Sequence, residues 1–357
     1  MAKVLHVISG LGLGGAEMAL ARLAVGLQKR GHPQQVVTLT GHGIVRNLLE
    51  LHSIPVTELK VGSVAKSFAA IFRLAALIRS TAPDVVQGWM YHGNLVATLA
   101  HVLAWSGLRP RLFWNIRASN MDACRYGQLI KWSARLSRLP DLIIANSNAG
   151  AQFHLQQGFQ PWRLEVLPNG IDTEKFRPDA SLRQAFRLAQ GIPPEAVLVI
   201  HVARVDPMKD HATFLAAMNK LPEVRAVLVG MGTQNLSLPP NVSALGLRTD
   251  VERLYPAADI VVSTSAFGEG FSNVLAEGMS AGLVPIATDV GDAKLIVGDT
   301  GIIVPPRDET ALAAAITRTV SLEPATRRRM GLAAREHIVT HFSLSRTVEA
   351  YERFYVS

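Results

Sequence analysis

The residues best suited to chemistry in this sequence are two carboxylates, Glu269 and Glu277, with seven residues between them. Gly268 and Gly270 flank the first, and residues 259–265 before it are typical of a buried parallel strand. We therefore expect Glu269 in the turn that follows a strand and Glu277 in the next helix. Carboxylates in these places could bind the hydroxyl groups of a sugar and of a ribose, although a loop charge and a solvated helix residue are the simpler interpretation.

The helix that carries Glu277 is expected to begin at Ser272, a preferred N-cap residue, followed by Asn273 and Val274. The first N–H groups of a helix and its positive dipole end attract anions. A rise of about 1.5 Å per residue then places a phosphate between the two carboxylates, which would lie roughly one nucleotide-sugar apart.

Two cations, Arg204 and Lys209, follow the apolar strand expected over residues 197–203. A guanidinium fork and a lysine point charge, five positions apart in one loop, can bind two phosphates. Ordinary loop basicity is the alternative for this pair.

A glycine pattern near the start of the chain predicts a different ligand. Gly10, Gly12 and Gly15 match G-x-G-x-x-G between a strand over 3–9 and a helix over 16–29, the context of dinucleotide binding. An NAD(P) enzyme would also place an acid at the end of the second strand, and the strand expected over 35–40 ends without one. The pattern therefore argues only weakly for a nicotinamide enzyme.

Two further polar residues are expected at strand ends, where open α/β sheets bind ligands. His92 follows a strand over 84–89 in a loop before a helix over 95–105, and Arg117 ends a strand over 111–119. Arg117 could face an acceptor phosphate or pair with a neighbouring residue. A solvated loop histidine is the simpler interpretation of His92.

The length of 357 residues, with 48% hydrophobic and 18% charged, predicts two globular domains. Residues 1–165 contain 17 Lys and Arg against 7 Asp and Glu, and the remainder 19 against 21. This basic half suits an anionic partner such as a membrane surface, although simple solubility is an alternative. Aromatic content of 6% argues against a nucleic-acid binder.

Two helices in the basic half are expected to be amphipathic. The helix over residues 125–138 combines four cations with apolar residues and could lie on an anionic bilayer, or could be an ordinary surface helix. The helix over residues 67–79 is expected to pack one apolar face against the core, formed by Phe68, Ile71, Phe72, Ala75 and Ile78.

The single cysteine, Cys124, and the absence of a signal-peptide pattern after Met1 predict a cytoplasmic protein. No apolar run reaches the roughly 20 residues that a membrane helix needs. No D-x-D triplet and no cluster with metal-ligand spacing occurs, so no metal site is predicted.

Several of these motifs together resemble one family. Residues 269–277 resemble the E-x7-E motif of retaining GT-B glycosyltransferases of family four, residues 204–209 their R-[LV]-x-x-x-K segment, and residues 168–172 their P-N-G-[IV]-D hinge. The resemblance implies an α/β fold with two Rossmann-like, doubly wound domains facing across a cleft. The first would cover residues 1–168, with a last helix over 342–357 crossing back to it, and the second residues 169–341.

The resemblance also implies roles for individual residues. Glu269 would bind the donor sugar, with His92 within reach of the sugar or the acceptor, and Glu277 would hold the ribose. The other residues expected around the donor are Gly14, Gly15, Arg204, Lys209, Leu247, Arg248, Ser272, Asn273 and Val274. Of these, Arg204 and Lys209 would bind the diphosphate, and the loop of Leu247 and Arg248 would face the base.

The function implied is that of a retaining hexosyltransferase that uses a nucleotide-diphospho-sugar and needs no cofactor. Its acceptor would be a saccharide or a polyprenyl-diphosphate-linked saccharide of surface polysaccharide biosynthesis, with peripheral attachment to the inner face of the plasma membrane left open. A nucleotide-sugar epimerase of the same fold is the nearest alternative, and an NAD(P)-dependent oxidoreductase is another.

Overall fold

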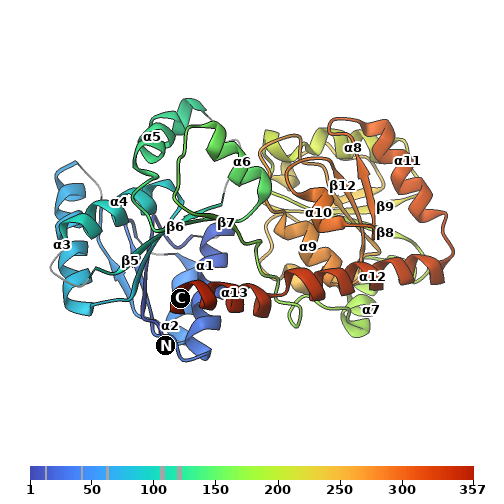
Figure 1. Cartoon of the computed structure of the whole chain (residues 1–357). Helices are drawn as coiled ribbons and strands as arrows, with labels where there is room; N and C mark the ends of the chain where they lie inside the picture. Colours follow the sequence, from blue (N-terminus) through green and yellow to red (C-terminus); the bar gives the residue numbers. More distant parts are fainter. Residues whose placement is uncertain (13, 42, 62–63, 105–108, 118, 120–122) are drawn as a thin grey trace. The chain divides into compact units, whose positions relative to one another are not determined.

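The structure, a computed structural model, describes residues 1–12, 14–41, 43–61, 64–104, 109–117, 119 and 123–357. Contacts within the chain divide it into two compact units, one of Met1–Gly170 with Leu344–Ser357 and one of Ile171–Ser343 (Figure 1). Each unit contains a parallel sheet with helices on both faces, which confirms the predicted α/β class.

The first unit has a seven-stranded sheet in the order β3-β2-β1-β4-β5-β6-β7. Its strands are β1 (Val4–Ile8), β2 (Gln34–Thr38), β3 (Val56–Glu58), β4 (Val85–Trp89), β5 (Arg111–Ile116), β6 (Leu142–Ala145) and β7 (Leu164–Val166). Its helices are α1 (Gly15–Lys29), α2 (Ile44–Leu51), α3 (Val64–Thr81), α4 (Met90–Leu103), α5 (Ala123–Leu136), α6 (Asn148–Gln156) and α13 (Leu344–Val356).

Side chains of this sheet alternate between two cores, because successive residues of a strand point to opposite faces. Along β1, Val4 and Ile8 pack with α1, α2 and α13, whereas Leu5 and Val7 pack with α3, α4 and α5. The last helix, α13, lies against α1, where a side chain at Gly26 would clash with Val348.

The second unit has a six-stranded sheet in the order β10-β9-β8-β11-β12-β13. Its strands are β8 (Leu198–Val202), β9 (Arg225–Val229), β10 (Val242–Ala244), β11 (Ile260–Ser263), β12 (Val284–Thr288) and β13 (Ile302–Val304). Its α-helices are α7 (Ala180–Ala189), α8 (His211–Asn219), α9 (Asn273–Ser280), α10 (Ala293–Val297), α11 (Glu309–Val320) and α12 (Pro324–Phe342). Short 3-10 helices are η1 (Pro207–Lys209), η2 (Thr233–Asn235), η3 (Val251–Arg253) and η4 (Tyr255–Ala257).

The predicted core face of α3 is confirmed for Ile71, Ala75 and Ile78, which are buried, and was wrong for Phe68 and Phe72. The buried side of α3 includes Ala70, Leu74 and Ile78. By contrast, Phe68 and Phe72 are 63% and 61% exposed. At 100° per residue these two phenylalanines lie roughly 100° from the centre of the buried arc. The apolar surface of α3 is therefore wider than the surface that the sheet can cover.

Candidate active site

The two loops that carry Lys209 and Glu269 leave neighbouring strands, β8 and β11, which pair in parallel. Their carboxyl ends therefore meet at the same edge of the sheet, where ligands of open α/β sheets bind. Thr264, which directly follows β11, donates its hydroxyl hydrogen bond to the carbonyl oxygens of Lys209 at 2.9 Å and Asp210 at 3.1 Å. This side chain fastens the two loops together.

At this edge Lys209 Nζ donates to Glu269 Oε2, and the hydroxyl of Ser265 donates to the same oxygen at 2.9 Å. The side chain of Lys209 is 20% exposed and that of Glu269 is 13% exposed, so the ion pair is accessible but largely enclosed. The structure thus brings together the residues predicted to bind a phosphate and a sugar. Ser265 was missed as a site residue, because the predicted strand over 259–265 included it, whereas β11 ends at Ser263.

The turn around Glu269 rests on the loop after β12. Gly291 has φ +62°, and a side chain there would clash with the carbonyl oxygens of Glu269 and Gly270. Asp292 N donates to the carbonyl oxygen of Gly270 at 3.1 Å. Glycine at position 291 therefore permits the close approach of backbone that fixes the turn.

Helix α9 begins at Asn273 with Ser272 as its N-cap, as the sequence predicted. The hydroxyl of Ser272 makes no capping hydrogen bond, and Val274, the next residue after Asn273, has its carbonyl bound by Tyr255 Oη at 3.2 Å. The first-turn N–H groups of any helix lack acceptors within the helix, so they can bind an anion. Glu277 lies about one turn further along, half-buried.

Arg204 is exposed, with 57% of its side chain accessible, and is held by Asp206 through Nη2 at 2.8 Å. Burial would raise the pKa of Asp206, but hydrogen bonds from Met208 N and from Arg204 outweigh it and lower the pKa. Asp206 therefore caps the start of η1 through Met208 N and also orients Arg204. Phosphate binding by Arg204 stays a prediction.

The loop predicted to face a base contains Leu247 and Arg248. Leu247 is 61% exposed. Arg248 forms a bidentate ion pair with Asp250, from Nε to Oδ1 at 2.8 Å and from Nη2 to Oδ2 at 2.6 Å. The side chain of Arg248 is thus occupied by Asp250, and the base contact of this loop stays a prediction.

In the first unit, Gly14 is the N-cap of α1, which begins at Gly15. Glu17 folds back over Gly14, where a side chain would clash with its carboxylate, and burial raises the pKa of Glu17. The first turn of α1 therefore has no side-chain cap, and the carboxylate of Glu17 lies beside it. Donor contact by Gly14 and Gly15 stays a prediction.

His92 lies in the first turn of α4 and not in a loop, so this part of the sequence interpretation was wrong. The chain passes from β4 into α4 through Met90, whose φ of +60° is unusual for a non-glycine residue. Gly93 permits the early start, because a side chain there would clash with the carbonyl of Val7. The ring of His92 reaches solvent, and partial desolvation lowers its pKa. The predicted end of this helix at Trp105 lies outside the described residues.

Arg117 is used inside the first unit. Its Nη1 donates to Asn169 Oδ1, its Nη2 donates to Tyr351 Oη at 3.2 Å, and its guanidinium stacks 4.7 Å from the ring centre of Trp89. Burial lowers its pKa. These contacts match the interpretation in which Arg117 binds neighbouring residues, and an acceptor contact has no support from its geometry.

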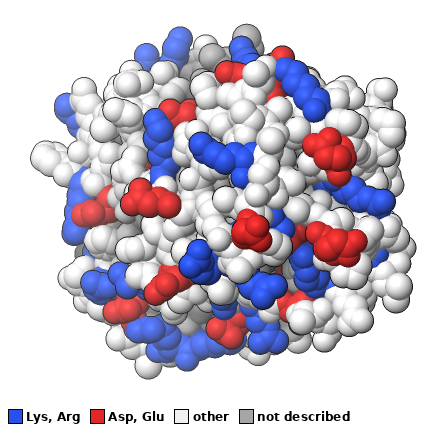
Figure 2. Space-filling model, turned by 90° about the vertical axis from the view of Figure 1, so that its right-hand side faces the viewer, with Lys and Arg blue, Asp and Glu red and all other residues white. Residues whose placement is uncertain are grey.

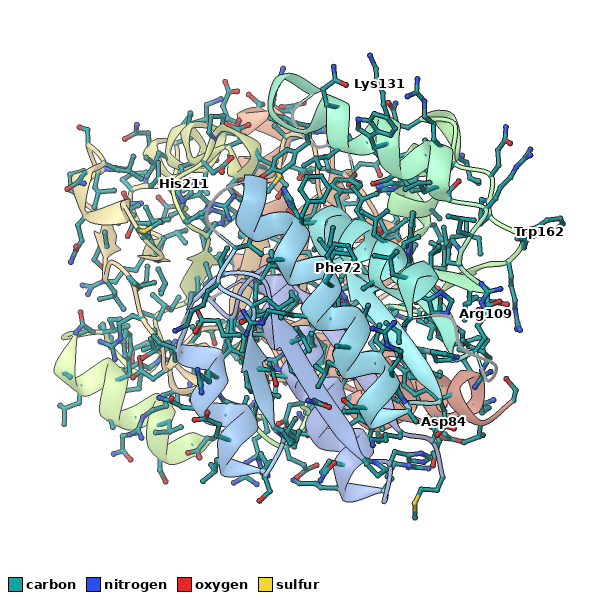
Figure 3. The ribbon with its side chains drawn as sticks, turned by 90° about the vertical axis from the view of Figure 1, so that its left-hand side faces the viewer. Phe72, Asp84, Arg109, Lys131, Trp162 and His211 are labelled. Carbon is teal, nitrogen blue, oxygen red and sulfur yellow. The ribbon has the colours of Figure 1, made fainter. Side chains whose placement is uncertain are left out.

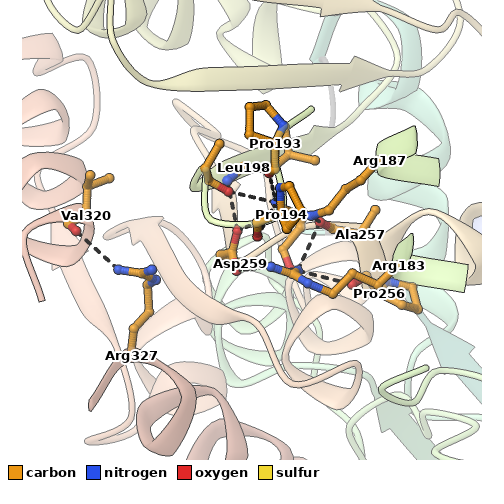
Figure 4. A network of polar contacts seen from close by, with 12 residues as sticks. Arg183, Arg187, Pro193, Pro194, Leu198, Pro256, Ala257, Asp259, Val320 and Arg327 are labelled. Atoms are coloured by element: carbon orange, nitrogen blue, oxygen red, sulfur yellow. Dashed lines mark hydrogen bonds and ion pairs between the residues drawn. The ribbon is translucent and has the colours of Figure 1, made fainter. Parts of the chain in front are cut away.

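A pocket of about 510 Å³ lies at the amino-terminal edge of the second sheet, opposite the edge of Lys209 and Glu269. Beside it, Asp259 accepts from Arg183 at 2.8 Å, from Arg187 at 2.7 Å and from Leu198 N at 2.9 Å (Figure 4). The two arginines also bind carbonyl oxygens before β8 and β11. This network holds α7 against the first residues of β8 and β11. None of the predicted site residues lines the pocket.

Within the described residues, no group of three or more His, Cys, Asp or Glu side chains is placed to hold a metal ion. No helix in the same residues has the length and apolar character to span a bilayer.

Comparison with known proteins gives matches to both units. Residues 13–175 match the family described as Glycosyltransferase Family 4, and residues 196–321 match Glycosyl transferases group 1. D-inositol 3-phosphate glycosyltransferases of Mycobacterium sp. (strain KMS) and Mycobacterium marinum are 33% and 32% identical over 56% and 58% of this chain. These matches cover 48% of each relative, so the chain spans about half the length of the curated relatives it matches.

Solved structures match over nearly the whole chain. Anabaena Alr3699/HepE, solved with UDP and glucose, has a TM-score of 0.87 at 23% identity, with 99% of both chains covered. A glycosyltransferase from Rickettsia africae has a TM-score of 0.84 at 21% identity, with 99% of this chain and 97% of that chain covered. These structures establish the GT-B fold. With one family match in each unit, the chain belongs to glycosyltransferase family 4, the group 1 glycosyltransferases.

Proposed function

We propose that the protein transfers a sugar from a nucleotide-diphospho-sugar to a hydroxyl group of an acceptor, with retention of the anomeric configuration. The observation that carries this proposal is the pairing of Lys209 with Glu269 at the carboxyl edge of the second sheet, next to the start of α9. A diphosphate needs cations and N–H groups, and a sugar needs a carboxylate that accepts from its hydroxyls. The site offers both, on two loops that leave the neighbouring strands β8 and β11.

Lys209 and the first N–H groups of α9 would bind the diphosphate of the donor. On donor binding, Lys209 would exchange Glu269 for a phosphate oxygen, and the released carboxylate would accept from a sugar hydroxyl. Ser265, already bonded to Glu269 at 2.9 Å, would keep that carboxylate in place during the exchange. Glu277 would accept hydrogen bonds from the ribose.

In the reaction, the acceptor oxygen forms a bond to the anomeric carbon on the face that the leaving group departs from. The bond between that carbon and the diphosphate oxygen breaks, and its electron pair stays with the diphosphate. The acceptor proton passes to the departing phosphate oxygen. Lys209 and α9 stabilise the charge that develops on the diphosphate, which is the electrostatic part of catalysis.

We propose a UDP-sugar as the donor, because the similar Anabaena protein is solved with UDP and glucose and with UDP-glucose. For the acceptor we propose a saccharide or polyprenyl-diphosphate-linked saccharide of surface polysaccharide synthesis, presented at the inner face of the plasma membrane. The similar fold of a lipopolysaccharide outer core galactosyltransferase and the excess of cations in residues 1–165 support this choice.

The test is an assay of nucleotide release from UDP-glucose, UDP-galactose and GDP-mannose with a panel of saccharide and lipid-linked acceptors. The proposal expects release that depends on the acceptor, and a product whose anomeric proton coupling by NMR matches the donor. Interconversion of nucleotide-sugars without an acceptor would instead identify an epimerase and overturn the transferase assignment.

A further inference from the structure

The outer surface of α3 exposes two large apolar side chains that the core does not use. Phe68 is 63% exposed and Phe72 is 61% exposed. They lie four residues apart, so they occupy the same side of the helix. Figure 3 shows Phe72 on the outer side of α3. Two exposed phenylalanines at helical spacing form a continuous apolar stripe.

The neighbouring helix α4 also exposes large apolar side chains. Leu99, Val102 and Leu103 are 44%, 51% and 45% exposed and lie on one side of the helix. Helices α3 and α4 pack together, and Arg79 Nη1 donates to the carbonyl oxygen of Leu103 at 3.0 Å. We call the five exposed apolar residues of the two helices the α3–α4 face. Exposed apolar surfaces of this kind mark interaction sites.

The helical layer that contains this face carries charge of a single sign. Helices α3, α4 and α5 contain no Asp or Glu and six cations, namely Lys66, Arg73, Arg79, Arg125, Lys131 and Arg135. By contrast, the face of the second unit seen in Figure 2 mixes cations and acids. The side chain of Arg125 lies outside the described residues, as does that of Lys66.

Helix α5 packs against α4 and carries an exposed tryptophan beside its cations. Trp132 is 53% exposed, and the guanidinium of Arg135 lies 5.0 Å from its ring centre. Lys131 extends from the surface of the same helix (Figure 3). Tryptophan beside lysine and arginine suits the boundary between lipid acyl chains and anionic headgroups.

We infer that the α3–α4 face docks onto an anionic phospholipid bilayer, with Phe68 and Phe72 inserted among the lipids and the cations at the headgroups. Lysine and arginine side chains near an anionic bilayer are attracted to its headgroups, and this attraction decays with distance over about one Debye length. A second copy of this chain fits the face less well. A symmetric dimer would place the cations of these helices against one another without an acid between them.

This inference deepens the proposed function, because it names the surface at which the protein would meet a membrane-held acceptor. Its test needs no catalysis. Co-sedimentation with vesicles of phosphatidylcholine and phosphatidylglycerol (3:1) should capture the wild-type chain, and pure phosphatidylcholine vesicles should capture it at least tenfold less. The double variant Phe68→Ser with Phe72→Ser should bind the anionic vesicles at least tenfold more weakly.

The matched control is Leu188→Ser, which changes an 82% exposed leucine of the second unit and should leave vesicle binding unchanged. The double variant should keep its melting temperature and its nucleotide release with a water-soluble acceptor, which separates loss of docking from loss of the transferase. Unchanged vesicle binding by the double variant would overturn the inference. So would a wild-type dimer in light scattering that the double variant converts to monomer, because a second copy would then cover the face.

Discussion

Lys209 and Glu269 form an ion pair at the carboxyl edge of the second sheet, with Ser265 bonded to the same carboxylate oxygen. Without a ligand, the ammonium group of Lys209 and the carboxylate of Glu269 neutralise each other. A bound diphosphate would compete with Glu269 for the lysine, and a bound sugar would compete with Lys209 for the carboxylate. Substitutions of Lys209 and of Glu269 should therefore weaken the binding of different parts of the donor, the diphosphate and the sugar.

We predict that Lys209→Ala and Glu269→Gln each lower the transfer rate by about 10²–10³-fold, the cost of removing one group that stabilises a transition state. Only Lys209→Ala should weaken UDP binding, because Glu269 faces the sugar and not the phosphates. Calorimetric titration with UDP and the nucleotide-release assay measure the two effects. Lys220→Ala, a lysine elsewhere in the second unit, is the control. Transfer within twofold of wild type in either variant would remove these residues from the site.

Glu277 should act on the nucleoside alone. Glu277→Ala is expected to weaken UDP binding about tenfold or more, since hydrogen bonds to a charged group contribute about 1.5–3 kcal/mol. Binding of inorganic pyrophosphate should not change, because pyrophosphate has no ribose. Calorimetric titration with each ligand separates the two, and the exposed Glu195→Ala is the matched control. An equal loss for both ligands would show that Glu277 acts on the helix and not on the ribose.

The sequence predicted the position of Glu269 well because local rules decide it. A buried strand, two glycines and an N-cap serine specify a strand, turn and helix without reference to distant residues. The pairing of Glu269 with Lys209 could not be predicted in the same way. It depends on β8 lying beside β11, and strand order in a sheet is not a local property.

Two errors in the first unit have the same origin. The periodicity of α3 shows which residues are apolar but not how much of that surface the sheet covers, so Phe68 and Phe72 were placed in the core. The start of α4 at Met90 depends on the close contact of Gly93 with β1, which no local pattern contains. Likewise, one partner of Arg117, Tyr351, comes from α13, more than two hundred residues away.

The Asp259 network predicts a large stability effect away from the site. Asp259→Asn should lower the free energy of unfolding by about 3–5 kcal/mol, because it leaves Arg183 and the buried Arg187 without a carboxylate. Urea denaturation followed by far-ultraviolet circular dichroism measures the change. Asp289→Asn breaks an exposed pair with Lys294 and should cost about 1 kcal/mol or less. Equal effects of the two substitutions would mean that the network contributes no more than a surface pair.

The first unit should lose stability as the pH falls from about 6.5, because it holds histidines in the neutral form. Trp89 Nε1 donates to His6 Nδ1 at 3.1 Å, which requires that nitrogen to be unprotonated, and burial lowers the pKa of His6 to about 4. His154 is bound by Tyr91 and Gly150, and burial lowers its pKa to about 4 as well. The unfolded chain binds protons at these histidines near pH 6.5, whereas the folded chain does so only near pH 4.

Between those values the unfolded state carries more protons, so acid favours unfolding. Each histidine should remove on the order of 2 kcal/mol of stability between pH 7 and pH 5. All five tryptophans lie in residues 1–165, so tryptophan fluorescence during urea denaturation at pH 7, 6 and 5 reports on this unit. His6→Gln should remove about 2 kcal/mol of the pH dependence between pH 7 and pH 5, whatever its effect on stability at pH 7. A pH dependence that is unchanged in this variant would show that His6 is not a source of the acid sensitivity.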